Sequence, residues 1–295
     1  QALGGSTNIA IGKLAAYKCG GGEGSVFIGE HAGAYNTTNR NVAIGSYAGK
    51  KITSGCENIS IGSCSMASGA GATGHRNLAM GRGSLCRVTS GGYNIALGNV
   101  AGNQLQTGNC NIFLGSYAAA CCDVTGNHNI ALGFESLKLL CSGSGNVAIG
   151  EKVANGTGSS GCVTGSDNVF LGTYAAQCVN QACDNVVIGC GAGRGIAYSN
   201  YNVILGKEAG YGCNGSIMVG YNCNVLLGIK AGACARTGSG NVMIGELAGF
   251  CHRQGYGNVQ IGKCSGKCNL CGCYNTYLGQ GSSVSNANGN YNVAI

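Results

Sequence analysis

The cysteines are the residues of this chain whose type and spacing are best suited to chemistry, and Cys268, Cys271 and Cys273 form the densest group. Cys268 and Cys271 make a CxxC, a spacing found in zinc sites and in dithiol redox centres. A zinc site needs a second pair of cysteines or histidine ligands. The nearest histidine is His252, and no HxxxH spacing occurs in the chain. We therefore expect no metal and interpret these thiols as disulfide partners.

The carboxylates and histidines do not predict a catalytic centre. Paired carboxylates for glycoside hydrolysis must lie about 5–9.5 Å apart, whereas Glu30, Glu151 and Glu246 are far apart in the sequence. The four histidines belong to unrelated segments, which disfavours a Cys/His or Ser/His/Asp nucleophile. They are His31, His75, His128 and His252. We expect no enzyme and no cofactor.

A tandem repeat must position any functional residues of the chain. The motif Asn-apolar-x-apolar-Gly recurs with a period of 17 residues, apart from insertions of five residues before Asn168 and Asn224. Ser25 replaces the asparagine in one copy. The asparagines are Asn8, Asn41, Asn58, Asn77, Asn94, Asn111, Asn129, Asn146, Asn168, Asn185, Asn202, Asn224, Asn241, Asn258, Asn275 and Asn292. Identical amide side chains stacked in register hydrogen-bond along the stack, so we predict a structural asparagine ladder.

Each motif predicts a short strand. Its two apolar positions, such as Val42 and Ile44, are two residues apart and mark one face. The residue between them varies, from Ala10 to Gln260, and is expected to point outwards. The glycine that follows predicts a positive φ or a close backbone approach. A small residue three positions later, such as Ala48, suggests two short strands that face each other across a narrow core.

Stacking of these repeats defines the fold. One repeat cannot bury its own face, so neighbouring repeats must stack as rungs about 4.8 Å apart. Almost every repeat contains several glycines, which disfavours helix. The sequence therefore predicts an all-β fold, a β-solenoid (parallel β-helix or β-roll) of about 17 rungs. We expect a single continuous domain over residues 1–295.

The chain contains 20 cysteines, an even number that favours an oxidising compartment in which thiols pair. Residues 17 apart would stack on adjacent rungs within disulfide distance, as for Cys234, Cys251 and Cys268. Pairs within one turn are equally compatible, and the connectivity stays open. The disulfide candidates are Cys178, Cys183, Cys213, Cys223, Cys234, Cys251, Cys268, Cys271 and Cys273. We predict a secreted protein or one on a cell or virion surface.

Composition excludes several other classes. There are 57 glycines and no proline, which excludes collagen. Hydrophobic residues make up 44% and charged residues 9%, which disfavours disorder. The net charge of +7 is scattered, and no apolar run reaches membrane-helix length, so we expect neither nucleic-acid binding nor membrane insertion. Glycosylation sequons occur at Asn36, Asn155 and Asn214, all in expected turns.

The repeated Asn-Val-Ala-Ile-Gly followed by Ala-Gly, at 41–49 and with Met for Ala at 241–249, resembles repeats of phage and viral tail-fibre proteins. More loosely, it resembles the β-roll heads of trimeric autotransporter adhesins. The resemblance implies rod-like fibres, often trimers, that bind surfaces. The last copy stops at Ile295, before its glycine, so open strand edges are expected to pair with other copies.

Two functions follow as hypotheses. The first is a structural subunit of an extracellular fibre, with copies of itself as partners in a homopolymer or homo-oligomer. The alternative is an adhesin or receptor-binding fibre that recognises surface glycan or protein. In that case Tyr47, Tyr117 and Tyr174, which occupy equivalent positions in the repeat, would supply the contacts.

Overall fold

The computed structural model of the chain describes residues 7–20, 22–67, 69, 71–156, 161–212, 220–268, 270–283 and 288–295. They divide into two compact units, residues 1–144 and residues 145–295. The continuity expected over residues 1–295 stays a prediction. In the part of the chain that the structure describes, no helix has the length and hydropathy to cross a membrane.

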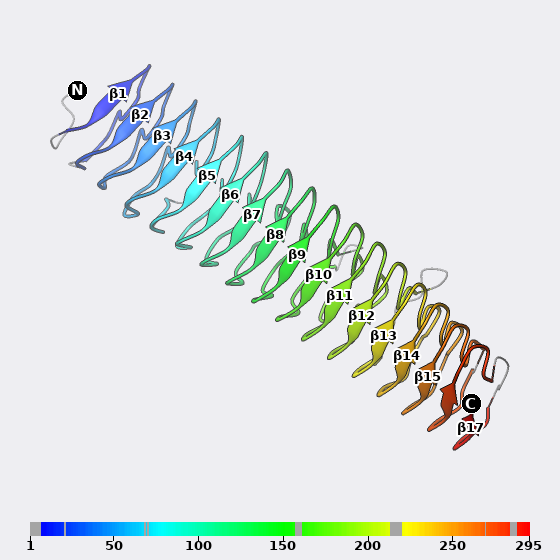
Figure 1. Cartoon of the computed structure of the whole chain (residues 1–295). Helices are drawn as coiled ribbons and strands as arrows, with labels where there is room; N and C mark the ends of the chain where they lie inside the picture. The colour runs from blue at the N-terminus through cyan, green and yellow to red at the C-terminus, as the bar shows by residue number, and fades with distance from the viewer. Residues whose placement is uncertain are drawn as a thin grey trace. The chain divides into compact units, whose positions relative to one another are not determined.

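Each unit is a parallel β-solenoid, as predicted (Figure 1). The N-terminal unit contains β1 (Ile9–Ile11), β2 (Val26–Ile28), β3 (Val42–Ile44), β4 (Ile59–Ile61), β5 (Leu78–Met80), β6 (Ile95–Leu97), β7 (Ile112–Leu114) and β8 (Ile130–Leu132). The C-terminal unit contains β9 (Val147–Ile149), β10 (Val169–Leu171), β11 (Val186–Ile188), β12 (Val203–Leu205), β13 (Val225–Leu227), β14 (Val242–Ile244), β15 (Val259–Ile261), β16 (Thr276–Leu278) and β17 (Val293–Ala294). Within a unit, equivalent residues of successive repeats pair in register, for example Ala96 with Phe113 and Val187 with Ile204.

Left-handed backbone conformations limit each strand to three residues at most. The repeat around β6 has positive φ at Tyr93 (60°), Gly98 (141°), Val100 (62°) and Gly102 (57°). The residues at these four positions in the other repeats also have positive φ, including many that are not glycine. One of these residues lies just before the motif asparagine and the next is the motif glycine. The chain therefore turns sharply on both sides of the strand.

The motif glycine is required for two reasons. A Cβ atom at Gly98 would lie 2.6 Å from the carbonyl oxygen of Gly115, the equivalent glycine of the next rung. Its φ of 141° is also outside the left-handed region that asparagine or aspartate tolerates. Successive rungs thus approach closely at the glycine column, as the sequence predicted.

The orientation predicted for the strands is wrong. From β2 to β16 the central residue is fully buried, whether it is Phe27, Ser60 or Tyr277. The flanking apolar residues, such as Val42 and Ile44, lie on the outer face and are only partly buried. A narrow coil admits one side chain from each strand, and the central position of a three-residue strand is the one that points inward. The uniform apolar columns therefore face outwards.

Variation in the core column is compensated within some of the rungs. Some large central residues face a glycine at the second left-handed position after the motif glycine, as in the pairs Phe27 with Gly33 and Leu226 with Gly232. A Cβ atom at Gly33 would lie 2.2 Å from the ring of Phe27. Some small central residues face large ones instead, as in the rung that contains Ala131 and Leu137, both fully buried. In these rungs a large and a small residue are thus paired across the core.

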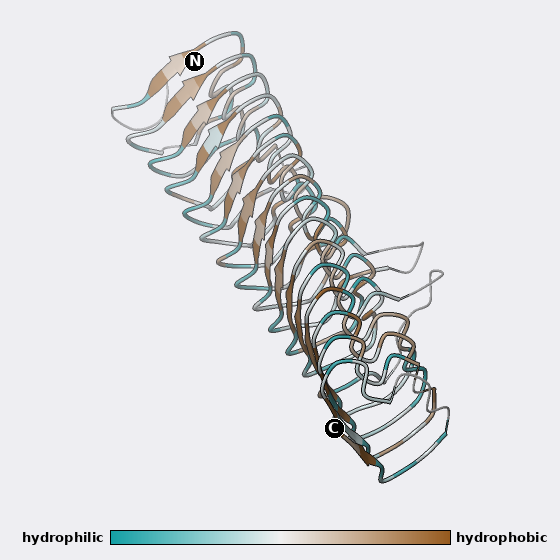
Figure 2. Cartoon of the chain, turned by 45° about the vertical axis from the view of Figure 1, so that its right-hand side comes forward, coloured by the Kyte–Doolittle hydropathy of each residue, from teal (hydrophilic) through white to brown (hydrophobic). Residues whose placement is uncertain are grey.

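The side of the coil opposite the strands consists of turns. The second strand predicted there is wrong, because only isolated bridges occur in the described residues, for example Leu105 with Val124. The small residues that suggested it are nevertheless buried in the core, as Ala48 and Ala101 show. Figure 2 accordingly shows hydrophobic strands along one side and mixed turns elsewhere.

Candidate functional surfaces

The asparagine column forms a continuous hydrogen-bonded ladder within each unit. Asn94 donates its backbone amide and its Nδ2 to Oδ1 of Asn77, at 3.0 Å each. The same Nδ2 also donates to the carbonyl oxygen of Gly108 in the next rung, at 2.8 Å. The Oδ1 of Asn94 accepts in turn from the amide of Asn111 at 2.9 Å. Each buried amide thus finds its partners in neighbouring rungs.

Ser25 maintains the acceptor function where asparagine is missing. Its backbone amide donates to Oδ1 of Asn8 at 2.8 Å, and its Oγ accepts from the amide of Asn41 at 3.1 Å. A hydroxyl cannot supply the two donor hydrogens of an amide. The ladder is therefore weaker, but unbroken, at this rung.

A second ladder lies two residues before the motif asparagine, and the sequence analysis missed it. In this ladder the side chain accepts a hydrogen bond from a backbone amide of the preceding rung. In the first ladder the side chain accepts a hydrogen bond from the backbone amide of the following rung. The acceptors are Asn39, His75, Asn109, Asn127, Ser144, Cys183, Asn200, Asn222, Ser239 and Asn290. The signal in the sequence is a column of short side chains with an acceptor atom, which resembles ordinary turn composition.

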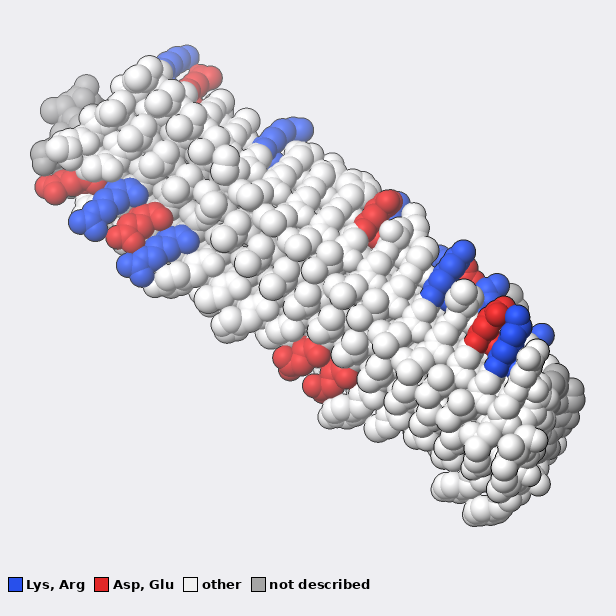
Figure 3. All heavy atoms as spheres, in the orientation of Figure 1, with Lys and Arg blue, Asp and Glu red and all other residues white. Residues whose placement is uncertain are grey.

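The outer face of the strands is apolar and uncharged. None of the seventeen strands in the described part of the chain contains a Lys, Arg, Asp or Glu. In the N-terminal unit, Ile59 is 39% exposed and Met80 is 41% exposed; in the C-terminal unit, Ile149 is 40% exposed. Figure 3 shows the charged residues in rows beside this face, with uncharged residues between them. Each unit therefore presents an extended apolar strip to the solvent.

The charged edges contain pairs between neighbouring rungs. On one edge Glu57 lies between Arg40, at 3.2 Å, and Arg76, at 2.6 Å. The hydrogen bond and charge of Arg76, followed by those of Arg40, lower the pKa of Glu57. On the other edge of the N-terminal unit Lys13 pairs with Glu30 at 3.9 Å, and in the C-terminal unit Lys263 pairs with Glu246 at 2.9 Å. These exposed pairs contribute little to stability, and they leave the strip between them without charge.

Most of the predicted disulfide cysteines have free thiols in the structure. They are Cys178, Cys183, Cys223, Cys251, Cys268, Cys271 and Cys273. Cys234 is disulfide-bonded, and Cys213 lies outside the described residues. The thiol of Cys183 accepts a hydrogen bond from the amide of Ser166 at 3.3 Å, so it belongs to the second ladder. The disulfide framework as a whole stays a prediction.

The glycosylation expected at Asn36 is wrong for the folded chain. Its side chain is fully buried, and its Oδ1 accepts from the amide of Thr38 at 2.9 Å. A glycan on Nδ2 would have to enter the core. Asn155 is partly buried and its site stays a prediction, while Asn214 lies outside the described residues.

The three tyrosines proposed as adhesin contacts lie next to basic side chains. Lys50 lies 4.9 Å from the ring centre of Tyr47, Lys138 lies 5.9 Å from that of Tyr117, and Lys152 lies 5.8 Å from that of Tyr174. Tyr47 also stacks on His31, with ring centres 4.9 Å apart. These contacts fix the rings on the surface, and their binding role stays a prediction.

No family model, curated protein or solved structure matches the chain.

Proposed function

We propose that the protein is a structural subunit of an extracellular fibre and that copies associate laterally through the outer faces of their strands. The observation that carries this proposal is the apolar strip of each unit. Contiguous exposed apolar surfaces of this kind are typical of protein interfaces. A strip with no charge in it loses little by being removed from water.

The periodicity of the strip favours a second copy as its partner. Two apolar columns, represented by Ile95 and Leu97 in β6, recur on nearly every rung at the strand spacing of about 4.8 Å, with Thr276 as the polar exception. A matching surface needs the same spacing over many rungs, and another copy of the chain has it. Two such faces would pack like the sheets of a β-sandwich, about 10 Å apart.

Two further features support a load-bearing role. The first ladder joins every pair of neighbouring rungs within a unit, and the second adds hydrogen bonds in the opposite direction between many of them, which gives the coil a continuous polar framework. The 20 cysteines favour an oxidising environment, and Cys234 is already in a disulfide. End-to-end pairing through rung edges remains a prediction for how such subunits would lengthen.

The test is to place charge on the strip. We expect the wild-type protein to form oligomers in analytical ultracentrifugation, and the double variant Ile59→Lys/Met80→Lys to sediment as a monomer. The control Ser63→Lys/Asn99→Lys adds the same charge at exposed positions outside the strands and should still assemble. Far-UV circular dichroism must show that both variants are folded. A monomeric wild-type protein at every soluble concentration, or an unaffected strip variant, would overturn the proposal.

A further inference from the structure

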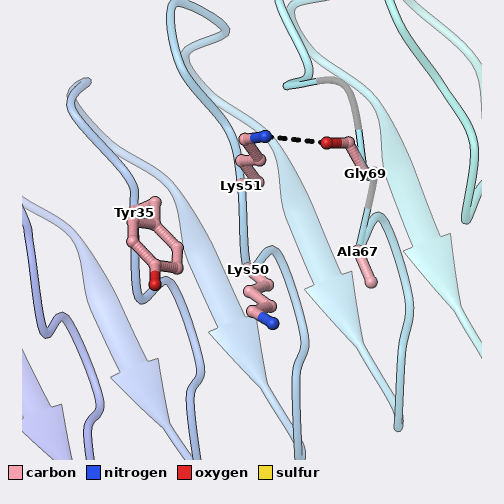
Figure 4. A pocket seen from close by; sticks show the side chains of 5 residues that line it. All are labelled: Tyr35, Lys50, Lys51, Ala67 and Gly69. Carbon is pink, nitrogen blue, oxygen red and sulfur yellow. Dashed lines mark hydrogen bonds between the residues drawn. The ribbon is translucent and has the colours of Figure 1, made fainter.

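A recess on the N-terminal unit is lined by Tyr35, Lys50, Lys51, Ala67 and Gly69 (Figure 4). It lies over turn segments that follow β2, β3 and β4, and its volume is about 320 Å³. It is therefore separate from the apolar strip, which the strands themselves form. A recess of this size accommodates a small ligand or one end of a larger one.

The recess is positively charged. Lys50 and Lys51 belong to it, and Lys18 lies beside it, 5.9 Å from the ring centre of Tyr35. None of these three lysines has a carboxylate partner among the residues that the structure describes. Lys51 donates to the carbonyl oxygen of Gly69 at 2.7 Å, which holds its ammonium group at the rim. The ammonium group of Lys51 is thus held in place, and no described carboxylate neutralises the positive charge of the three lysines.

The recess also has an aromatic wall. The side chain of Tyr35 is 37% exposed, and its backbone amide donates to the carbonyl oxygen of Lys50 at 2.9 Å. Tyr35 lies on the rung between those of Lys18 and Lys51, at the equivalent position of the repeat. The exposed ring face can contact a flat, weakly polar ligand surface while the lysines of the recess bind an anionic substituent.

We propose that this recess binds an acidic sugar residue of a polysaccharide, one that carries a carboxylate or sulfate group. The sugar ring would lie against Tyr35, and its anionic group would be bound by Lys50 and Lys51. An inorganic anion would use the lysines and leave the aromatic wall uncovered. A neutral sugar would leave the lysines without a partner. The acidic sugar is the class of ligand that uses both features.

The binding test uses a heparin-derived oligosaccharide as the probe and titration calorimetry as the measurement. We expect the double variant Lys50→Gln/Lys51→Gln to bind about tenfold or more weakly and Tyr35→Leu about threefold or more weakly, since each removes one of the two contacts. The single variant Lys50→Gln keeps the Lys51 bond to Gly69 and should also bind more weakly. Lys207→Gln/Lys267→Gln removes the same net charge elsewhere and should bind like the wild type.

Several results would overturn the proposal. Equal weakening by Lys207→Gln/Lys267→Gln would mean that the net charge alone attracts the probe. An unchanged affinity of Tyr35→Leu would exclude the aromatic wall. Competition by a single-stranded oligonucleotide at lower concentration than the oligosaccharide would assign the recess to phosphate-containing chains. Binding of neutral dextran with the same affinity would remove the role of charge.

This inference does not depend on the fibre proposal. The recess variants should keep the wild-type sedimentation behaviour, and Ile59→Lys/Met80→Lys should still bind the oligosaccharide. Failure of one proposal would therefore leave the result for the other intact.

Discussion

The Oδ1 atom of Asn77 accepts two hydrogen bonds from Asn94, one from its backbone amide and one from its side chain, at 3.0 Å each. We expect Asn94→Ala to lower the free energy of unfolding by about 3–5 kcal/mol. The change leaves the amide of Asn111 and the carbonyl oxygen of Gly108 without these partners in a buried environment. Chemical denaturation followed by circular dichroism measures the loss.

The control for this prediction is Asn99→Ala in the same repeat. The side chain of Asn99 is exposed, and only its backbone oxygen takes part in hydrogen bonds between rungs, such as that from Tyr117 at 3.0 Å. We expect a change below about 0.5 kcal/mol. Equal effects of the two substitutions would contradict a structural role for the ladder.

The motif glycine should not tolerate even alanine. In Gly98→Ala the new Cβ would meet the carbonyl oxygen of Gly115 at 2.6 Å, at a φ of 141°. We expect a loss of about 2–4 kcal/mol in thermal or chemical unfolding. Gly240→Asn is the matched control, because Gly240 has a φ of 70° and no neighbour closer than 3.9 Å to its ideal Cβ. Its stability should stay close to that of the wild type.

Cys251 and Cys268 are free thiols on neighbouring rungs, and the two side chains interact directly. Burial raises the pKa of Cys251, and the charge and hydrogen bond of Cys268 raise it further. We expect oxidised glutathione to convert the two thiols to a disulfide, with release of two molecules of reduced glutathione. Peptide mapping without reductant should recover the linked peptides. The closed loop of about 17 residues should add about 3 kcal/mol to the free energy of unfolding.

Replacing one partner checks this assignment. In Cys268→Ser the linked peptide should disappear, and Cys251 should instead carry a glutathione adduct. Recovery of both thiols unmodified in the wild-type protein after prolonged oxidation would show that the pair cannot form a disulfide.

Tyr221 should make the fold sensitive to alkali. Its side chain is fully buried, with the hydroxyl 3.9 Å from Sδ of Met243, and burial raises its pKa. The unfolded state loses this proton near pH 10 while the folded state keeps it, so stability is complete below about pH 10 and falls above it. At pH 11 the loss from this group is about 1.4 kcal/mol.

The comparison of Tyr221→Phe with the wild type isolates this effect. The slope of unfolding free energy against pH above pH 10 should be shallower in Tyr221→Phe. Tyr201→Phe removes a tyrosine that is 62% exposed, and its slope should match that of the wild type. Identical slopes in all three proteins would show that Tyr221 ionises in the folded state.

The repeat, the parallel stack and the glycine column could be predicted from the sequence because each depends on a residue type that recurs in phase. The face of the strand on which each side chain lies could not be predicted in this way. Uniform apolar residues such as Val42 and Ile44 are typical of a core, whereas variable ones such as Ser60 and Gln260 are typical of a surface. In this coil the central side chain that enters the narrow interior differs from rung to rung, and in some rungs a facing residue of complementary size accompanies it. The apolar residues that recur from repeat to repeat therefore belong to the outer strip and not to the core.

The candidate sites were harder to predict for a different reason. The recess brings together Tyr35 and Lys51, which are 16 residues apart and unremarkable in their own turns. The second ladder uses Asn, Ser, Cys and His interchangeably, since each offers one acceptor atom. A search for one repeated residue type finds the first ladder and overlooks the second.

The two repeats of 22 residues have a practical consequence. Across them the amide of Asn168 still reaches Oδ1 of Asn146 at 3.2 Å, the amide of Asn224 still reaches Oδ1 of Asn202 at 3.0 Å, and the strands stay in register. The two longer repeats thus leave the pairing with the following rung unchanged. The segments before Asn168 and Asn224 are therefore natural grafting points, where peptides could be inserted and displayed at fixed places along the C-terminal unit.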